Sequence, residues 1–145
     1  MTRPFPTIHA CALRIGEAGL LIRGASRSGK SSLTLALIEE AKAQGRPARL
    51  VADDRFGLRH EEGALYAQPH PAIAGQIEKR GFGILTLPHE PRVRLTHVID
   101  LTDQSPPKEL VERGGYAVDG VTLTRFELPA GEPPGPAAQA VLAKI

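Results

Sequence analysis

The chain has 145 residues, 41% of them hydrophobic, which is enough for one domain with a single packed core. Its 18 basic and 16 acidic residues are spread along the chain without a polybasic stretch, so nucleic acid is not an expected partner. A single cysteine excludes an intrachain disulfide, and no apolar run reaches the roughly 18 residues of a membrane span. We therefore expect a cytoplasmic protein that binds no membrane.

The first elements follow from the spacing of apolar residues. Two strands are predicted at 8–15 and 19–23, on either side of a glycine-containing turn. From residue 30 the period becomes helical, and apolar residues recur at a spacing of four up to Ala41. Gly45 and Pro47 then predict the end of the helix near residue 44.

The remaining two thirds of the chain read mostly as strands and turns. Strands or hairpins are predicted at 49–53, 56–60, 64–68, 77–87, 93–101 and 118–128, and a short helix from Pro106 towards Glu112. The segment 129–136 resembles a linker without helix or strand, and 137–145 a short helix. We therefore expect an α/β fold with a mixed sheet, a catalytic domain over 1–128, and a Pro/Gly-rich linker with a short helix over 129–145.

The strongest functional motif is G-A-S-R-S-G-K-S, which fits the P-loop pattern G-x-x-x-x-G-K-[ST] between a predicted strand and a predicted helix. Backbone N–H groups of such a loop cradle phosphates, and the positive end of the helix adds to the attraction. The lysine would reach the β- and γ-phosphates of ATP, and the last serine would bind Mg²⁺. The expected cradle residues are Gly24, Ala25, Ser26, Arg27, Ser28, Gly29, Lys30 and Ser31.

Two acidic residues, Asp53 and Asp54, follow the predicted strand at 49–53. Strand ends of a β-α-β unit meet at one edge of the sheet, so these carboxylates should lie near the phosphates. One of them would hold the metal and the other would accept a hydroxyl proton. The alternative is an Asp pair that caps the next turn.

Taken together, these segments resemble the catalytic domain of HPr kinase/phosphorylase. The likeness rests on His9, the 24–31 cradle, L-V-A-D-D at 50–54 and I-E-K-R-G-F-G-I at 77–84. The last segment resembles the signature E-x-R-G-x-G of that family. The chain resembles short α-proteobacterial forms that lack the family's N-terminal domain.

The resemblance implies an ATP- and Mg²⁺-dependent kinase that phosphorylates a serine of HPr, or of an HPr-like phosphocarrier, and works as a hexamer. It also implies the reverse, phosphate-driven reaction that gives pyrophosphate. Asp53 would be the base, Lys30 would hold phosphates, and Ser31 with Glu78 would bind the metal. His9 would lie near the attacked phosphate, and Arg80 and Asp54 would be further phosphate contacts. The family's glycine-rich loop with a catalytic arginine has no clear equivalent here; Arg92 and Arg94 stand in its place.

Other interpretations remain open from the residues alone. Glu78 and Arg80 also suit an exposed ion pair, His9 an edge histidine, and Cys11 a small core residue. A small-molecule kinase would keep the cradle and leave the 77–84 segment away from the phosphates. A non-enzymatic nucleotide-binding module would need no base at Asp53.

Overall fold

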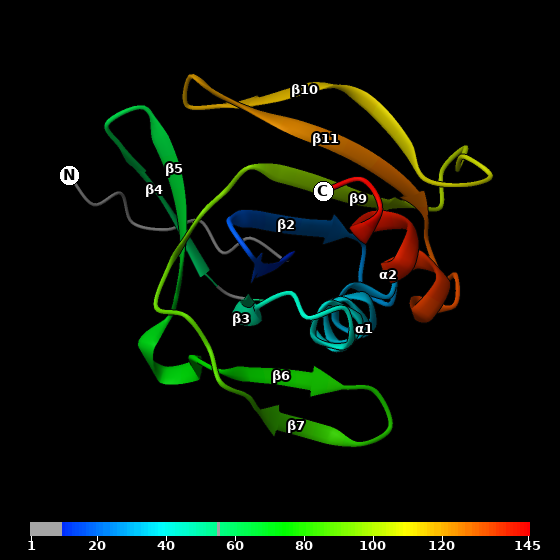
Figure 1. Ribbon diagram of the computed structural model, residues 1–145, viewed down its shortest axis with the longest axis horizontal. Helices are drawn as coiled ribbons and strands as arrows, with labels where there is room; N and C mark the ends of the chain where they lie inside the picture. The colour runs from blue at the N-terminus through cyan, green and yellow to red at the C-terminus, as the bar shows by residue number, and fades with distance from the viewer. Residues whose placement is uncertain (1–9, 55) are drawn as a thin grey trace.

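The computed structural model describes residues 10–54 and 56–145 and confirms an α/β fold with a mixed sheet (Figure 1). The first half holds β1 (Ala10–Ile15), β2 (Ala18–Gly24), α1 (Lys30–Ala43), β3 (Ala48–Asp53), β4 (Phe56–Glu61), β5 (Ala64–Pro69) and the short 3₁₀ helix η1 (Pro71–Ile73). The second half holds β6 (Gln76–Lys79), β7 (Gly83–Thr86), β8 (Val93–Arg94), β9 (His97–Thr102), β10 (Val111–Val118), β11 (Val121–Pro129) and α2 (Pro134–Leu142).

The main sheet has six strands in the order β10-β11-β9-β2-β1-β3. Strands β2, β9 and β11 are parallel neighbours, whereas β1 is antiparallel to both β2 and β3. Because β2 and β3 flank the same antiparallel strand, both run in one direction and end at the same edge of the sheet. This edge receives the loop after β2 and the acidic residues after β3.

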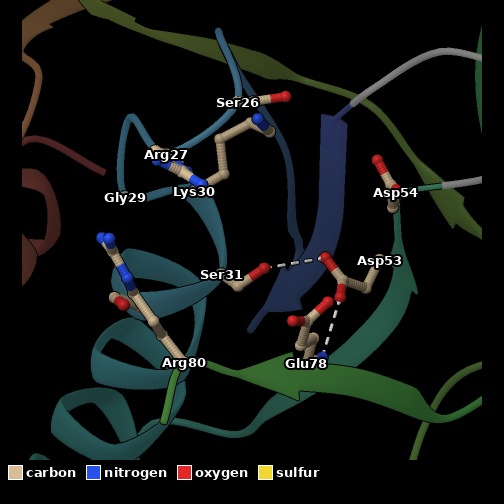
Figure 2. A pocket seen from close by; sticks show the side chains of 10 residues that line it. Ser26, Arg27, Gly29, Lys30, Ser31, Asp53, Asp54, Glu78 and Arg80 are labelled. Carbon is tan, nitrogen blue, oxygen red and sulfur yellow. Dashed lines mark hydrogen bonds between the residues drawn. The ribbon is translucent and has the colours of Figure 1, made fainter. Parts of the chain in front are cut away.

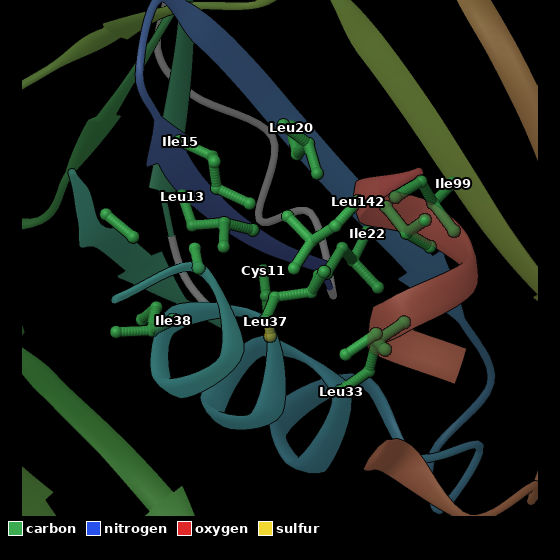
Figure 3. Close-up of a cluster of buried hydrophobic side chains, with 14 of the residues drawn as sticks. Cys11, Leu13, Ile15, Leu20, Ile22, Leu33, Leu37, Ile38, Ile99 and Leu142 are labelled. Carbon is green, nitrogen blue, oxygen red and sulfur yellow. The ribbon is translucent and has the colours of Figure 1, made fainter. Parts of the chain in front are cut away.

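Both faces of the main sheet are covered. Alternate residues of β1 and β2 enter two different apolar clusters, as the period of two in a strand requires: Leu13 and Leu20 belong to one, Ala12 and Leu21 to the other. The first cluster contains Leu33 and Leu37 of α1 and lies between the sheet and the two helices (Figure 3). The second contains Phe56, Leu65 and Val93, which belong to the three-stranded sheet β4-β5-β8.

Two expectations for the second half were wrong. No helix follows Pro106; the chain stays irregular up to Leu110, and β10 begins at Val111. The C-terminal helix begins at Pro134, inside the stretch expected to be a linker. Proline at the first turn lacks an N–H that would have no helical partner anyway, so α2 loses no hydrogen bond there.

Helix α2 packs against α1 through Ala138, Val141 and Leu142, which are buried. Arg46, just after α1, donates hydrogen bonds to the carbonyls of Leu142 and Ile145, each at 3.1 Å. In the described part of the chain, no helix is long and apolar enough to cross a membrane.

Candidate functional site

A cavity of about 420 Å³ opens where the ends of β2 and β3 meet the start of α1 (Figure 2). Three distant parts of the chain form its walls: the loop after β2, the end of β3 and the β6–β7 hairpin. Its lining residues are Ser26, Arg27, Gly29, Lys30, Ser31, Ser32, Asp53, Asp54, Glu78 and Arg80. The cavity thus brings together most of the site residues expected from sequence.

The 24–31 loop turns tightly between β2 and α1. Gly29, the N-cap of α1, has φ 99°, a left-handed conformation that side-chain-bearing residues rarely adopt. Gly24 leaves no room for a Cβ, which would collide with Ser28 Oγ and crowd Leu101. No acidic side chain of α1 itself occupies its first turn.

Lys30 folds back over the loop. Its Nζ donates hydrogen bonds to the carbonyls of Gly24 at 2.9 Å and Ala25 at 3.0 Å. The ammonium group therefore sits at the mouth of the loop and lines the cavity. Gly24, Ala25 and Ser28 do not line this cavity; they shape the loop beneath it, and Ser28 is buried.

Asp53 at the end of β3 is held by three donors. The hydroxyl of Ser31 donates to its Oδ1 at 3.0 Å, and the backbone N–H of Glu78 donates to Oδ2 at 3.1 Å (Figure 2). The thiol of Cys11 donates to Oδ1 at 2.9 Å. The carboxylate thus has a fixed orientation towards the first turn of α1 and the 24–31 loop.

The contact between Cys11 and Asp53 was missed from sequence. The alternation of β1 places Cys11 on the helix-covered face, and the β1–β3 register pairs Cys11 with Asp53. Burial, together with the charge of Asp53, raises the pKa of the Cys11 thiol, so the group stays protonated and remains a donor. Only the pairing of β1 with β3 could have revealed this contact, and no pattern in the sequence specifies that pairing.

Glu78 and Arg80 reach the cavity from the β6–β7 hairpin, and both side chains are exposed. Glu78 lies in β6, whereas Arg80 lies in the turn after it, so the two do not share one strand as expected. The hairpin is tied to the site because the Glu78 amide bonds to Asp53.

The other predicted residues lie as follows. Asp54 lines the cavity with φ 68°, and its N–H donates to the carbonyl of Ala10 at 2.8 Å. His9 falls outside the described residues. Arg92 is turned away: it pairs with Glu61 at 2.9 Å and stacks over the ring of Tyr66. Arg94 follows two residues later, in β8, and neither arginine lines the cavity.

The oxygen atoms of the cavity suit a hard cation. A hydroxyl from Ser31 and carboxylates from Asp53 and Glu78 are the ligand types that Mg²⁺ takes, usually together with phosphate oxygens and water. Within residues 10–54 and 56–145, no three His, Cys, Asp or Glu side chains gather as a ready-made metal centre.

Known proteins resemble this chain in sequence and structure. The family model described as the HPr Serine kinase C-terminal domain matches residues 3–102. The HPr kinase/phosphorylase of Geobacillus thermodenitrificans is 32% identical over 137 residues, which cover 87% of this chain and 41% of that protein. HPr kinase/phosphorylase 1 of Oceanobacillus iheyensis is 31% identical over 139 residues, or 90% of this chain and 43% of that protein.

A solved structure agrees with the sequence matches. The structure of the Hpr(Ser) kinase/phosphatase from Coxiella burnetii superposes with a TM-score of 0.76 at 26% identity, and the match covers 94% of this chain and 93% of that chain. The chain spans less than half the length of the two curated relatives described above.

Proposed function

Because the chain belongs to the HPr Serine kinase C-terminal domain family, we propose that it is an ATP-dependent kinase that phosphorylates a serine of HPr or of an HPr-like phosphocarrier. The observation that carries the proposal is the grouping of Lys30, Ser31, Asp53 and Glu78 around one cavity. These residues supply a cation, a hydroxyl and two carboxylates at the start of a helix, which is what phosphoryl transfer requires.

In the proposed binding mode, the 24–31 loop is a P-loop. Its backbone N–H groups and the start of α1 attract the phosphates of ATP. The Nζ of Lys30 exchanges its two carbonyl contacts for the β- and γ-phosphates. Ser31 and Glu78 would hold Mg²⁺, which would supply positive charge to the phosphate oxygens.

In the proposed reaction, the partner's seryl oxygen attacks the γ-phosphorus and loses its proton to the carboxylate of Asp53. A new O–P bond forms while the bond from the γ-phosphorus to the β,γ-bridging oxygen breaks, and ADP leaves. The three donors to Asp53 keep its carboxylate oriented for this role without a large rearrangement. General-base catalysis of this kind contributes about 10²- to 10⁴-fold to a rate.

The same residues suit the reverse reaction. An oxygen of inorganic phosphate attacks the phosphoserine, and the bond from that phosphorus to the seryl oxygen breaks. Asp53 takes the proton of the attacking phosphate and returns it to the seryl oxygen, and the products are serine and pyrophosphate. Neither Arg92 nor Arg94 lines the cavity, whereas Arg27 and Arg80 do, so we assign the further positive charge of this site to these two side chains.

The position of the β6–β7 hairpin favours this proposal over a small-molecule kinase. That alternative would leave the 77–84 segment away from the phosphates, whereas Glu78 is hydrogen-bonded to Asp53 beside the loop. A purely nucleotide-binding module would need no carboxylate fixed by three donors.

The hexamer and the cytoplasmic location stay predictions. Light scattering after size-exclusion chromatography tests the hexamer.

Transfer of labelled γ-phosphate from ATP to purified HPr tests the proposal. Asp53→Asn and Lys30→Met should each lower the transfer rate about 100-fold or more. Asp103→Asn and Lys42→Met are matched controls, because both side chains are exposed and lie outside the cavity. An unlabelled HPr in the presence of bound ATP would refute the assigned substrate, and equal rates in all four variants would refute the assigned site.

A further inference from the structure

We propose that the nucleoside of the phosphate donor binds in a second, smaller cleft beside the main cavity. This side cleft has a volume of about 170 Å³ and lies between the 24–31 loop and the C-terminal segment 129–137. The inference rests on the proposed kinase function, and it assigns a binding role to a part of the chain that the phosphate-site residues do not include.

The side cleft adjoins the main cavity, because the two share part of their walls. Arg27, Gly29, Ser32 and Arg80 line both hollows. Two of these shared residues are arginines, so the passage between the hollows is positively charged. A donor whose γ- and β-phosphates occupy the main cavity would carry its α-phosphate through this passage and its nucleoside beyond it.

The chemistry of the walls changes from polar to apolar along this path. Beyond the passage, the apolar part of the side cleft is formed by Leu33, Leu101, Pro129, Pro134 and Ala137, and Ser28, Gly131 and the acidic Glu132 complete its lining. Aliphatic and proline surfaces of this kind cover the faces of a planar base without an aromatic residue. The side cleft is smaller than the roughly 300 Å³ of a complete small-molecule site, so it suits one part of a ligand whose remainder lies in the main cavity.

The loop and the C-terminal segment are held together at the side cleft. The N–H of Gly131 donates to the carbonyl of Ser28 at 3.1 Å, which fixes the distance between the two walls. Ser28 Oγ is buried and has no hydrogen-bond partner among the described residues. A buried hydroxyl without a partner is costly, and a polar atom of the nucleoside would relieve this cost.

Five of the twelve residues that line the side cleft lie beyond 102, where the family match ends. The main cavity, by contrast, is built entirely by residues up to Arg80. The C-terminal segment would thus distinguish a nucleotide from inorganic polyphosphate, whereas the earlier part of the chain would bind phosphates from either.

The test compares ATP with inorganic tripolyphosphate, which carries the phosphates without the nucleoside. Calorimetry with Mg²⁺ on the full chain should give a Kd for ATP about tenfold or more below that for tripolyphosphate. Ala137→Phe fills the side cleft and should raise the Kd for ATP about tenfold while changing that for tripolyphosphate less than twofold. Gln139→Phe is the matched control, since it adds the same ring to an exposed position of α2 outside the cleft.

The outcomes separate this inference from the kinase proposal. Equal wild-type affinities for both ligands, or an Ala137→Phe variant that binds ATP normally, would overturn the inference and leave the phosphate site standing. Binding of neither ligand by the wild type would overturn both. If Ala137→Phe does not fold, Ala137→Leu gives the same comparison with a smaller intrusion, and the wild-type comparison decides independently of any variant.

Discussion

The thiol of Cys11 donates a hydrogen bond to the carboxylate of Asp53, with 2.9 Å between Sγ and Oδ1. The two residues are cross-strand partners on β1 and β3, and Cys11 is fully buried. A residue that resembles ordinary core in the sequence therefore touches the proposed base. Its contribution can be separated from packing because serine keeps a donor at this position and valine does not.

Replacement of Cys11 tests this contact. Cys11→Val should lower kcat for phosphoryl transfer about fivefold, the kinetic equivalent of one lost hydrogen bond of about 1 kcal/mol, with little change in the KM for ATP. Cys11→Ser retains a donor and should keep kcat within about twofold of the wild type. Steady-state kinetics of both variants decide the point, and a valine variant as active as the serine variant would show that the contact has no role in orienting Asp53.

The raised pKa of the Cys11 thiol predicts low reactivity. Burial is the main cause and the charge of Asp53 adds to it, so the thiolate is disfavoured at neutral and mildly alkaline pH. Iodoacetamide at pH 8 should therefore modify the native protein far more slowly than the urea-unfolded chain. Mass spectrometry over time measures both rates, and comparable rates would contradict the buried, protonated state.

Asp100 predicts a loss of stability in acid. Burial alone would raise its pKa, but hydrogen bonds from Arg23 and Arg125, at 2.7 to 2.8 Å, outweigh burial and lower it. A carboxyl whose folded pKa is below its unfolded value stabilises the fold above about pH 4, and this stabilisation is lost as the pH falls further. We therefore expect the urea midpoint of the wild type to fall steeply in that range.

Asp100→Asn should lower the free energy of unfolding at pH 7 by roughly 1 to 2 kcal/mol and flatten its acid dependence, because the variant has no carboxylate to protonate. The exposed Asp103→Asn serves as the control and should follow the wild type. If the free energy of unfolding falls with decreasing pH as steeply in Asp100→Asn as in the wild type, Asp100 does not cause the loss of stability in acid.

Gly19 predicts a large effect from one added methyl group. A Cβ at this position would overlap the backbone carbonyl of Arg94, which cannot move aside as a side chain can. Gly19→Ala should therefore destabilise the fold by about 3 kcal/mol, at the upper end for overpacking. Gly114→Ala, in an open position of β10, should be nearly neutral. Thermal unfolding of the two variants compares them directly.

Much of the fold follows from local sequence, and the failures have physical causes. The helix over 30–43 and the strand ending at Asp53 were predicted because their apolar spacing is regular and Gly45 and Pro47 mark a boundary. The helix expected after Pro106 is absent, since prolines permit a helix start without providing a buried face to hold one. The prolines before α2 do lead into a helix, because Ala138, Val141 and Leu142 pack on α1 and so hold it in place.

The candidate site likewise has features that local sequence predicts and features that it does not. Lys30, Ser31 and Asp53 were identified from motifs that are continuous in sequence. The bond of Cys11 to Asp53 and the side cleft depend on strand register and on a C-terminal segment about 100 residues from the loop. Such long-range pairings leave no local pattern, so they emerge only from the assembled sheet.

The strand order also bears on where this chain can be shortened. The family match ends at Thr102, but β9 pairs on one side with β11, which lies in the part beyond. A protein cut at residue 102 would carry β9 as a bare edge with open N–H and C=O groups, and α1 would lose the cover of α2. Exposed edges of this kind join other chains, so such a fragment is expected to aggregate rather than fold. The length matched by the family model is thus shorter than the length needed to pair β9 on both sides and to cover α1.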